Sequence, residues 1–360
     1  MFHAGKRRFN VRVTVIRAEE LSEDLAQQWR NVQATNPALA GPCFRPELFA
    51  AVGRFRPDVR VAVLEDDRQS VAGFLPFLLD GRWPVAKPVP LCDYQAIIGP
   101  ASHRWDARRA IWSAGLKAWD FDHLVGVETL ATPPSFCRPA DAPRVQLAEG
   151  TEAYLSSLGS HGKSLKAIAS SKRYLERDVG PTRFVPMCND TSVFHQVLRW
   201  KAERFNEGRA LDGWLVGALE SLYRQTGPDF FGALSALYAG DHLVAAHFGL
   251  RCQGVLFYWF PAFNFDFSRY SPGRLLLYHL LAGLDAFGCH TLDFGPGGES
   301  YKRSFSNQAL QIVAGSFEVA SVFSLARNCK RRLITGIRSN RWLRGGARTV
   351  LRTLRGIGRR

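Results

Sequence analysis

The sequence predicts a mixed α/β protein built from two tandem halves, each a mixed, largely antiparallel sheet with flanking helices. Three observations support this fold class. Stretches rich in β-branched and apolar residues, such as VRVTVIRA at 11–18, predict strands. Apolar side chains four residues apart, such as Leu25 and Trp29 after Ser22, predict amphipathic helices. A succession of antiparallel strands, one helix and one parallel strand then occurs twice within 360 residues.

The first half is predicted to span residues 11–150 and begins with that strand and helix. The elements expected next are a hairpin over 58–81 with its polar turn at 66–68, a helix over 107–119, a strand over 121–130 and a proline-rich crossover over 131–143.

The second half is predicted to span residues 151–325 and repeats this order at greater length. Its expected strands lie at 144–149, just before the boundary, and at 182–187, 230–240, 242–252, 254–263, 290–295 and 311–320. Its expected helices begin at 152 and 164, cover 193–205 and 211–225, and include a buried helix over 271–288 and a short one after 298.

The net charge of +15 is concentrated at the C-terminus. Residues 326–360 hold twelve lysines and arginines and no acidic residue, and without them the net charge falls to +3. Leu351, Leu354 and Ile357 recur at helical spacing among the arginines, which predicts a basic amphipathic tail. We expect this tail to contact the anionic inner face of a membrane or a synthase complex. The alternative is a solubilising helix that docks on the body of the protein.

Several classes of protein are disfavoured by composition. The N-terminus lacks the apolar core of a secretory signal, and no apolar run approaches the roughly 20 residues of a membrane helix, so a cytoplasmic protein is expected. The seven cysteines include no C-x-x-C pair, and His242 and His247 point to opposite faces of a predicted strand. Neither a disulfide framework nor a metal site is therefore expected.

The segment LDFGPGGESYKRSF at 292–305 is the strongest candidate for a reacting site. A strand delivers Asp293 to the crevice at the strand ends, and the glycine-rich turn is expected to fold the chain back toward that crevice. We predict catalytic roles for Asp293, Glu299, Tyr301 and Lys302, with Lys302 the most important, and a substrate contact for Arg303. The alternative is a glycine-proline turn followed by a solvated basic helix.

The segment SPGR at 271–274 opens the buried helix directly after a strand and a loop. A helix N-terminus behind small residues suits a phosphate group, with Arg274 as its charge partner. Simple helix initiation by Ser271 and Pro272 is the alternative.

Other side chains are weaker candidates for contacts with the acceptor substrate. Asp93 and Tyr94 stand in an apolar context and are expected to reach the cleft between the halves, unless Tyr94 is simply a buried, hydrogen-bonded tyrosine. Lys172 and Arg173 belong to a row of cations on one helix, which forms either a solvated face or a face for an anionic substrate.

From about residue 150 to 320 the sequence resembles the acetyltransferase domain of the GNAT superfamily, in its BioF-like and CelD-like branch, which is related to the FemAB peptidyl transferases. The segments that carry the resemblance are SKRYLERDVG (171–180), RWKAERF (199–205), RYSPGRLLLYHLL (269–281) and LDFGPGGESYKRSF (292–305), with CFRPELFAAV (43–52) and LCDYQAIIGP (91–100) upstream. The resemblance implies two tandem GNAT-like folds with the cleft in the second.

The resemblance also implies roles for individual residues. Acetyl-CoA or another acyl-CoA would be the co-substrate, with its pyrophosphate at Ser271, Gly273 and Arg274. In the usual loop of the superfamily, small residues stand where this chain has Pro272 and Arg274. The remaining implied contacts are Tyr258, Trp259 and Phe260 beside the acyl group, Tyr301 or Tyr258 as the acid, Asp293 or Glu299 as the base, and Trp200 and Arg204 toward the acceptor.

The implied activity is an acyl-CoA-dependent N- or O-acyltransferase acting on an envelope, polysaccharide or sugar-linked acceptor. One alternative is a FemAB-like transferase that uses aminoacyl-tRNA, the only case in which a nucleic-acid partner is expected. Another is a non-catalytic GNAT-like protein that binds within a polysaccharide-synthesis complex.

Overall fold

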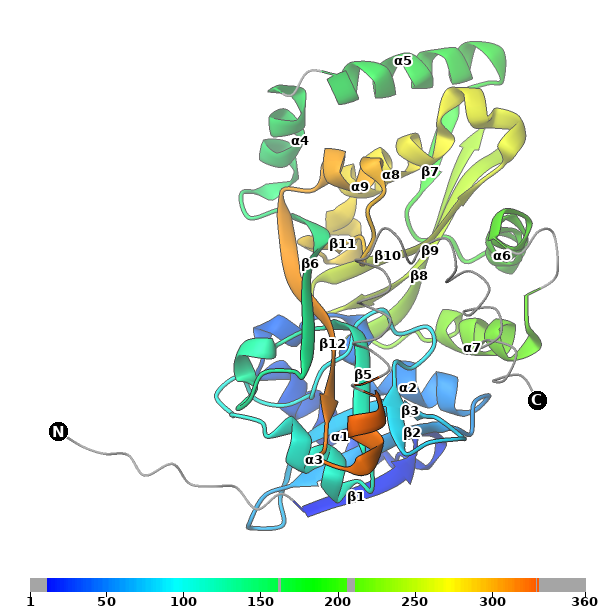
Figure 1. The fold of residues 1–360 in the computed structure, drawn as a ribbon. Helices are drawn as coiled ribbons and strands as arrows, with labels where there is room; N and C mark the ends of the chain where they lie inside the picture. The colour runs from blue at the N-terminus through cyan, green and yellow to red at the C-terminus, as the bar shows by residue number, and fades with distance from the viewer. Residues whose placement is uncertain (1–11, 161–162, 206–210, 328, 330–360) are drawn as a thin grey trace, which may run out of the picture.

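The computed structural model describes residues 12–160, 163–205, 211–327 and 329, so nearly all of the predicted basic tail lies outside the described residues. The described chain forms one twelve-stranded mixed sheet flanked by helices (Figure 1). Its strand order is β1-β2-β3-β4-β5-β12-β6-β11-β10-β9-β8-β7. This confirms the predicted mixed α/β fold class.

The elements of the first half follow the predicted order closely. They are β1 (Arg12–Arg17), α1 (Glu23–Ala34), α2 (Pro46–Gly53), β2 (Val59–Glu65), β3 (Val71–Leu79), β4 (Val85–Lys87), α3 (Ala107–Ser113) and β5 (Ala118–Leu124). The helix predicted over 107–119 is shorter than expected, because Gly115 has a φ of 76° and ends it. Ala118 and Trp119 therefore belong to the strand that follows.

The remaining elements are one more strand before the boundary predicted near residue 150 and then the strands and helices of the second half. They are β6 (Phe136–Gln146), α4 (Gly150–Ser160), α5 (Lys163–Asp178), β7 (Thr182–Val185), α6 (Thr191–Phe205), α7 (Gly213–Tyr223), β8 (Phe230–Ala239), β9 (His242–Cys252), β10 (Val255–Phe263), α8 (Pro272–Ala282), β11 (Thr291–Asp293), α9 (Ser300–Phe305) and β12 (Gln308–Glu318). A 3₁₀ turn, Leu284–Phe287, occupies the end of the predicted helix over 271–288.

Two strand pairs in the sheet are parallel, β4 with β5 and β10 with β11, and each pair is connected through a helix. The remaining ladders between the described strands are antiparallel. The two halves thus share the predicted succession of antiparallel strands, a helix and a parallel strand.

The prediction that residues 131–143 form a crossover loop is wrong, because most of this segment belongs to β6. Pro139 and Pro143 are accommodated because both point their backbone nitrogen away from β12. The carbonyl of Pro143 accepts a hydrogen bond from Phe294 on that far side, and Pro139, four residues earlier, has the same orientation. Neither proline therefore removes a hydrogen bond from the β6–β12 ladder.

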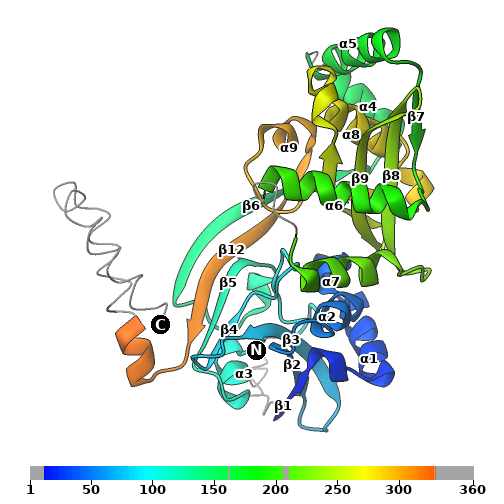
Figure 2. The ribbon, with the colours of Figure 1, turned by 90° about the vertical axis from the view of Figure 1, so that its right-hand side faces the viewer.

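The boundary predicted near residue 150 remains a prediction, since the sheet and an apolar core both run across it. Strand β12, which comes last in the chain, lies between β5 and β6, and β6 also pairs with β11. A single apolar cluster joins Phe44 and Tyr94 of the first half to Phe248 and Phe257 of the second. Helices α6 and α8 pack on opposite faces of β8–β10 (Figure 2).

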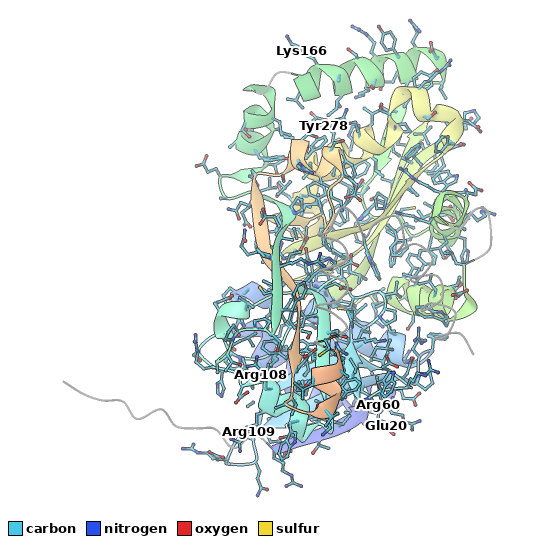
Figure 3. All side chains as sticks on the ribbon, viewed as in Figure 1. Glu20, Arg60, Arg108, Arg109, Lys166 and Tyr278 are labelled. Atoms are coloured by element: carbon cyan, nitrogen blue, oxygen red, sulfur yellow. The ribbon has the colours of Figure 1, made fainter. Side chains whose placement is uncertain are left out.

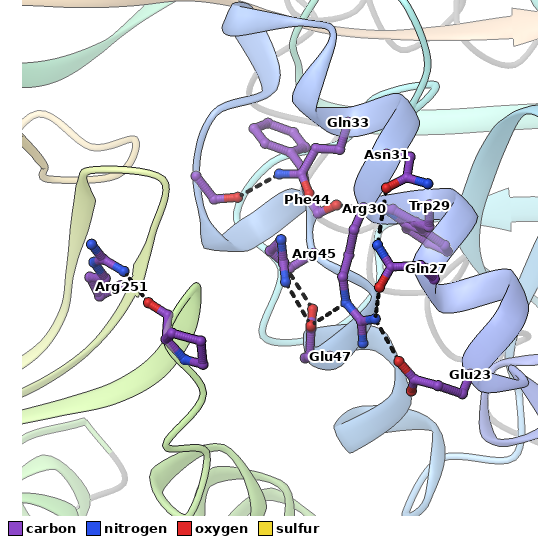
Figure 4. Close-up of polar contacts among 12 residues, drawn as sticks. Glu23, Gln27, Trp29, Arg30, Asn31, Gln33, Phe44, Arg45, Glu47 and Arg251 are labelled. Atoms are coloured by element: carbon purple, nitrogen blue, oxygen red, sulfur yellow. Dashed lines mark hydrogen bonds and ion pairs between the residues drawn. The ribbon is translucent and has the colours of Figure 1, made fainter.

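A polar network ties α1 to α2 in the first half (Figure 4). The Glu47 carboxylate accepts hydrogen bonds from Arg30 at 2.9 Å and from Arg45 at 2.8 and 2.9 Å. Burial alone raises the pKa of Glu47, but the two guanidinium groups outweigh burial and the net pKa is lowered.

No helix among the described residues has the length and apolar character needed to cross a membrane.

Candidate active site

The central feature of the site is the separation of β10 from β11. The two strands pair only where Val255–Phe257 lie beside Thr291–Asp293. Beyond this point β10 is irregular, with a register shift against β9 between Phe257 and Phe260, and it continues to Phe263. The chain that leaves β11 instead turns away at Gly295, whose φ is 70°. The backbone of residues 258–260 thus lies where its neighbouring strand has ended, which is the place where α/β sheets leave room for a ligand.

The glycine-rich turn is bonded to the Lys302 side chain. The Lys302 ammonium donates a hydrogen bond to the Pro296 carbonyl at 3.0 Å and lies 3.1 Å from the Glu299 carboxylate, and its side chain is 8% exposed. Gly297 has a φ of 134°, and a Cβ there would lie 2.9 Å from the Lys302 nitrogen and 2.4 Å from a Glu299 oxygen. A side chain at Gly297 would therefore displace both charged groups.

The Asp293 carboxylate makes hydrogen bonds and an ion pair within the protein. Its Oδ1 accepts hydrogen bonds from the Tyr94 hydroxyl at 2.7 Å and from the Gly295 amide at 2.8 Å. Its Oδ2 accepts two more from Arg144, at 2.7 and 2.9 Å, and its side chain is 4% exposed. Both oxygens are thus saturated, so this geometry gives Asp293 the part of a buried link between the two halves rather than that of a base.

Asp93 lies close to Gly295, and its carboxylate makes different contacts from that of Asp293. Its Oδ2 is 3.3 Å from the position that a Cβ of Gly295 would occupy, and its backbone carbonyl contacts the His123 imidazole at 2.9 Å. Within the described part of the chain, its carboxylate has no hydrogen-bond donor and no ion-pair partner in contact. Burial raises the pKa of Asp93, against the opposing influence of His123 and Lys302. A half-buried carboxylate with a raised pKa is a suitable proton acceptor.

Lys201 on α6 is a site residue that the sequence did not single out. It lines a cavity of about 420 Å³ between α6 and the end of β10, together with Trp200, Arg204, Phe263 and other residues. Burial first, and then Arg204 and Lys302, lower the pKa of Lys201 to about 8, although Glu299 acts in the opposite direction. Helix α6 and the turn before α9 therefore face each other closely enough for their charges to interact.

A second cavity, of about 600 Å³, lies on the other side of the glycine-rich turn. It is lined by Pro296–Gly298 from the turn, by Arg303, by His123 from β5 and by residues of β6 and β12. Lys302 is bonded to Pro296, which lines this cavity, and its charge acts on Lys201, which lines the first cavity.

Tyr258, Trp259 and Phe260, which were predicted to lie beside the acyl group, belong to the irregular part of β10. The buried Tyr258 ring stacks on His247 at 4.7 Å and meets Phe294 edge-on at 5.7 Å. Trp259 and Phe260 form an edge-to-face pair at 4.7 Å. Burial raises the pKa of Tyr258 far above its usual value, and burial together with Glu299 raises that of Tyr301 to about 12. Both hydroxyls therefore stay protonated at neutral pH.

The N-terminus of α8 differs from a simple phosphate cradle. Ser271 has a φ of 52° and makes no capping hydrogen bond with its side chain, Pro272 has no N–H, and the amides of Arg274 and Leu275 both donate to the Ser271 carbonyl. A Cβ on Gly273 would lie 3.4 Å from the Phe263 ring, so this ring separates the helix N-terminus from the α6 cavity.

Lys172 and Arg173 were predicted to contact the substrate, and each interacts with a residue of its own helix. Lys172 lies 3.8 Å from Glu176, and Arg173 stacks on Tyr174. Their helix α5 forms the outer edge of the second half, where Lys166 is labelled (Figure 3). Among the described residues there is no cluster of three or more potential metal ligands.

Comparisons with known proteins agree with this geometry. Residues 162–303 match the family model of the acetyltransferase (GNAT) domain. This part of the chain has a GNAT-type fold. No curated protein matches the sequence.

The chain is also similar to several solved structures, of which FemX supports the fold. FemX is similar with a TM-score of 0.53 and 11% identity, over 84% of this chain and 97% of that one. The L-PGS structure from Bacillus licheniformis has a TM-score of 0.47 and 10% identity, over 86% and 96% of the two chains. A tandem GNAT protein from the clavulanic acid biosynthesis pathway has a TM-score of 0.44 and 12% identity, over 86% and 99%. At these identities the likeness concerns the fold alone.

Proposed function

We propose that this protein is an acyl-CoA-dependent N- or O-acyltransferase, with acetyl-CoA as donor, that acts on an envelope, polysaccharide or sugar-linked acceptor. The observation that carries the proposal is the separation of β10 from β11, with Lys302 bonded to the turn that follows β11 and the N-terminus of α8 next to Phe263 at the end of β10. The acceptor class comes from the sequence resemblance to the CelD-like branch. A bound acyl-CoA would supply a thioester whose carbonyl carbon bonds to an amine or hydroxyl while its C–S bond breaks. The coenzyme A thiolate then leaves with a proton from Tyr301 or Tyr258.

In the proposed transfer each residue at the opening has a separate role. Asp93 takes the proton from the attacking amine or hydroxyl, because its burial makes it a stronger base than an exposed carboxylate. Lys302 supplies positive charge for the oxygen that becomes negative, and backbone N–H groups near Trp259 and Phe260 face the same place. The turn over 295–298 holds Lys302 in position through Pro296.

A substitution at Gly273 is the first test of where the acyl donor binds. Acetyl-CoA at about 100 times its dissociation constant should stabilise the protein by about 2.7 kcal/mol, visible as a rise in Tm. Gly273→Val should weaken this stabilisation and leave the Tm without ligand nearly unchanged, since the first carbon of the new side chain meets only Phe263 at 3.4 Å. Gly273→Ala is the matched control. An unchanged affinity of Gly273→Val for acetyl-CoA would move the donor away from α8.

The same thermal-shift measurement separates the proposal from its alternatives. Aminoacyl-tRNA that stabilises the protein where acetyl-CoA does not would favour a FemAB-like transferase. Stabilisation by neither donor would favour a non-catalytic binding protein.

We also propose that the tail over residues 326–360 holds the protein at the inner face of an anionic membrane. Each basic residue near such a surface contributes about 1 kcal/mol at most, so several together suffice for reversible binding. The full chain should sediment with anionic vesicles, and a chain ending at Ser324 should not. Equal sedimentation of the two chains would show that the tail is not an anchor.

A further inference from the structure

Four large apolar side chains are exposed at one end of the molecule. Trp83 is 52% exposed, Trp112 60%, Val322 84% and Leu325 66%. Trp83 belongs to the turn between β3 and β4, Trp112 to α3, and the other two to a short helix over 322–327 that follows β12. We call these four side chains the apolar face. Helix α3 and the short helix both lie at the end of the molecule away from α9 (Figures 1 and 2).

Backbone hydrogen bonds bring the segments of the apolar face together. The Lys117 amide donates to the Pro84 carbonyl at 2.7 Å, and the Lys117 carbonyl accepts from the Val319 amide at 3.0 Å. Helix α3 ends four residues before Lys117. The Trp83 ring also contacts the Phe323 ring, with 5.5 Å between the ring centres. A single exposed apolar residue is ordinary on a protein surface, but several large ones around one point indicate a partner.

Ion pairs hold the short helix in place and neutralise the acidic groups around it. Arg327 pairs with Asp120 of β5 and with Glu318 at the end of β12. Asp80, in the turn before β4, pairs with Lys87. Because these carboxylates already lie beside cations, they repel an approaching anionic surface only weakly.

The sequence indicates which partner covers the apolar face. Residues 326–360 continue directly from it and hold twelve lysines and arginines and no acidic residue. A partner that suits both features has an anionic surface above an apolar interior, as a bilayer with anionic headgroups has. Tryptophan is favoured at the boundary between headgroups and acyl chains, because its ring is apolar and its N–H is polar.

We propose that the apolar face inserts into the surface of an anionic lipid bilayer and orients the folded body on it. This inference rests on the proposed membrane contact of the tail, but it assigns a contact to residues of the folded body. The tail would supply electrostatic attraction, which salt screens. The apolar face would supply burial of apolar surface, which does not depend on that attraction.

The experiment is sedimentation of the full chain with vesicles of equal parts phosphatidylglycerol and phosphatidylcholine. It is run at low salt and at about 1 M salt, where the screening length falls to about 3 Å. The parent should keep part of its binding at high salt. The double variant Trp83→Ser/Trp112→Ser should bind about 10-fold more weakly at low salt and not at all at high salt.

The control variant is Tyr174→Ser on the outer helix α5. Tyr174 is also exposed, but it lies outside the apolar face, so this variant should bind vesicles as the parent does at both salt concentrations. Both variants should melt close to the parent, because the rings that they remove are largely exposed.

The outcomes separate this inference from the proposal about the tail. If the double variant sediments as the parent does at both salt concentrations, the apolar face does not contact lipid and the inference is wrong. If the chain ending at Ser324 sediments like the full chain and the double variant does not, the apolar face stands and the tail is not the anchor. If the parent binds no vesicles, both proposals are overturned, and a dimer that the double variant lacks would identify a second copy as the partner.

Discussion

Replacing Lys302 with alanine should lower the turnover of acyl transfer by about 10² to 10³, the usual cost of losing one electrostatic donor in an active site. The reason is its place in the structure. The ammonium is held by Pro296 and Glu299 at the edge of the opening between β10 and β11, where the reacting oxygen would gain negative charge. Turnover is measured as thiol release from acetyl-CoA with an amino-sugar acceptor.

The burial of Lys302 changes what is expected for stability. Alanine would leave the Pro296 carbonyl without its donor, so Lys302→Ala should also cost about 1 to 3 kcal/mol of unfolding free energy. Lys302→Met retains most of the packing, and Lys302→Arg keeps the charge but not its position, so arginine should restore turnover only in part. A Lys302→Met protein with parental turnover would show that the lysine only shapes the turn.

The elements were predictable wherever the local pattern was strong. Helix α8 follows from its Pro272 start and its run of leucines, and the hairpin β2–β3 from its polar turn. The segment over 136–146 was missed because proline usually disfavours strands. Whether a proline is tolerated depends on which side its nitrogen faces, and that is decided by a partner strand about 170 residues later in the chain.

The site was predictable only where its residues are neighbours in the sequence. The segment 292–305 was sufficient by itself to predict Lys302, Glu299 and the glycine-rich turn as parts of the site. Lys201 was not predicted because a lysine on an amphipathic helix usually faces water. Its lowered pKa arises only in the folded protein, from burial and from the nearby charges of Arg204 and Lys302. In the same way the partners of Asp293 could not be predicted, because they lie far away in the sequence: Tyr94 between β4 and α3, and Arg144 on β6.

Two aspartates at this edge should respond in opposite ways to the same change. Asp293 forms a buried ion pair with Arg144, so Asp293→Asn should destabilise the fold by about 3 to 5 kcal/mol, as expected when a buried charge loses its partner. Asp93 has a raised pKa, which means that the folded state favours its protonated form. Its contribution to stability is full below the unfolded pKa and is lost as pH rises through the folded pKa.

Once ionised, Asp93 therefore costs stability, so Asp93→Asn should raise the Tm measured at a pH above the Asp93 pKa while lowering turnover by about 10² to 10⁴. The gain in Tm should shrink as the pH of the melting experiment is lowered, because asparagine then replaces a carboxyl that is already neutral. Turnover of the parent should rise with pH through the Asp93 pKa, and this limb should be missing in Asp93→Asn. A buried carboxylate that must ionise to accept a proton costs stability in its active form, so its neutral replacement should gain stability while losing function. If Asp93→Asn instead lowers the Tm as Asp293→Asn does, Asp93 is a second structural carboxylate and the proton acceptor lies elsewhere.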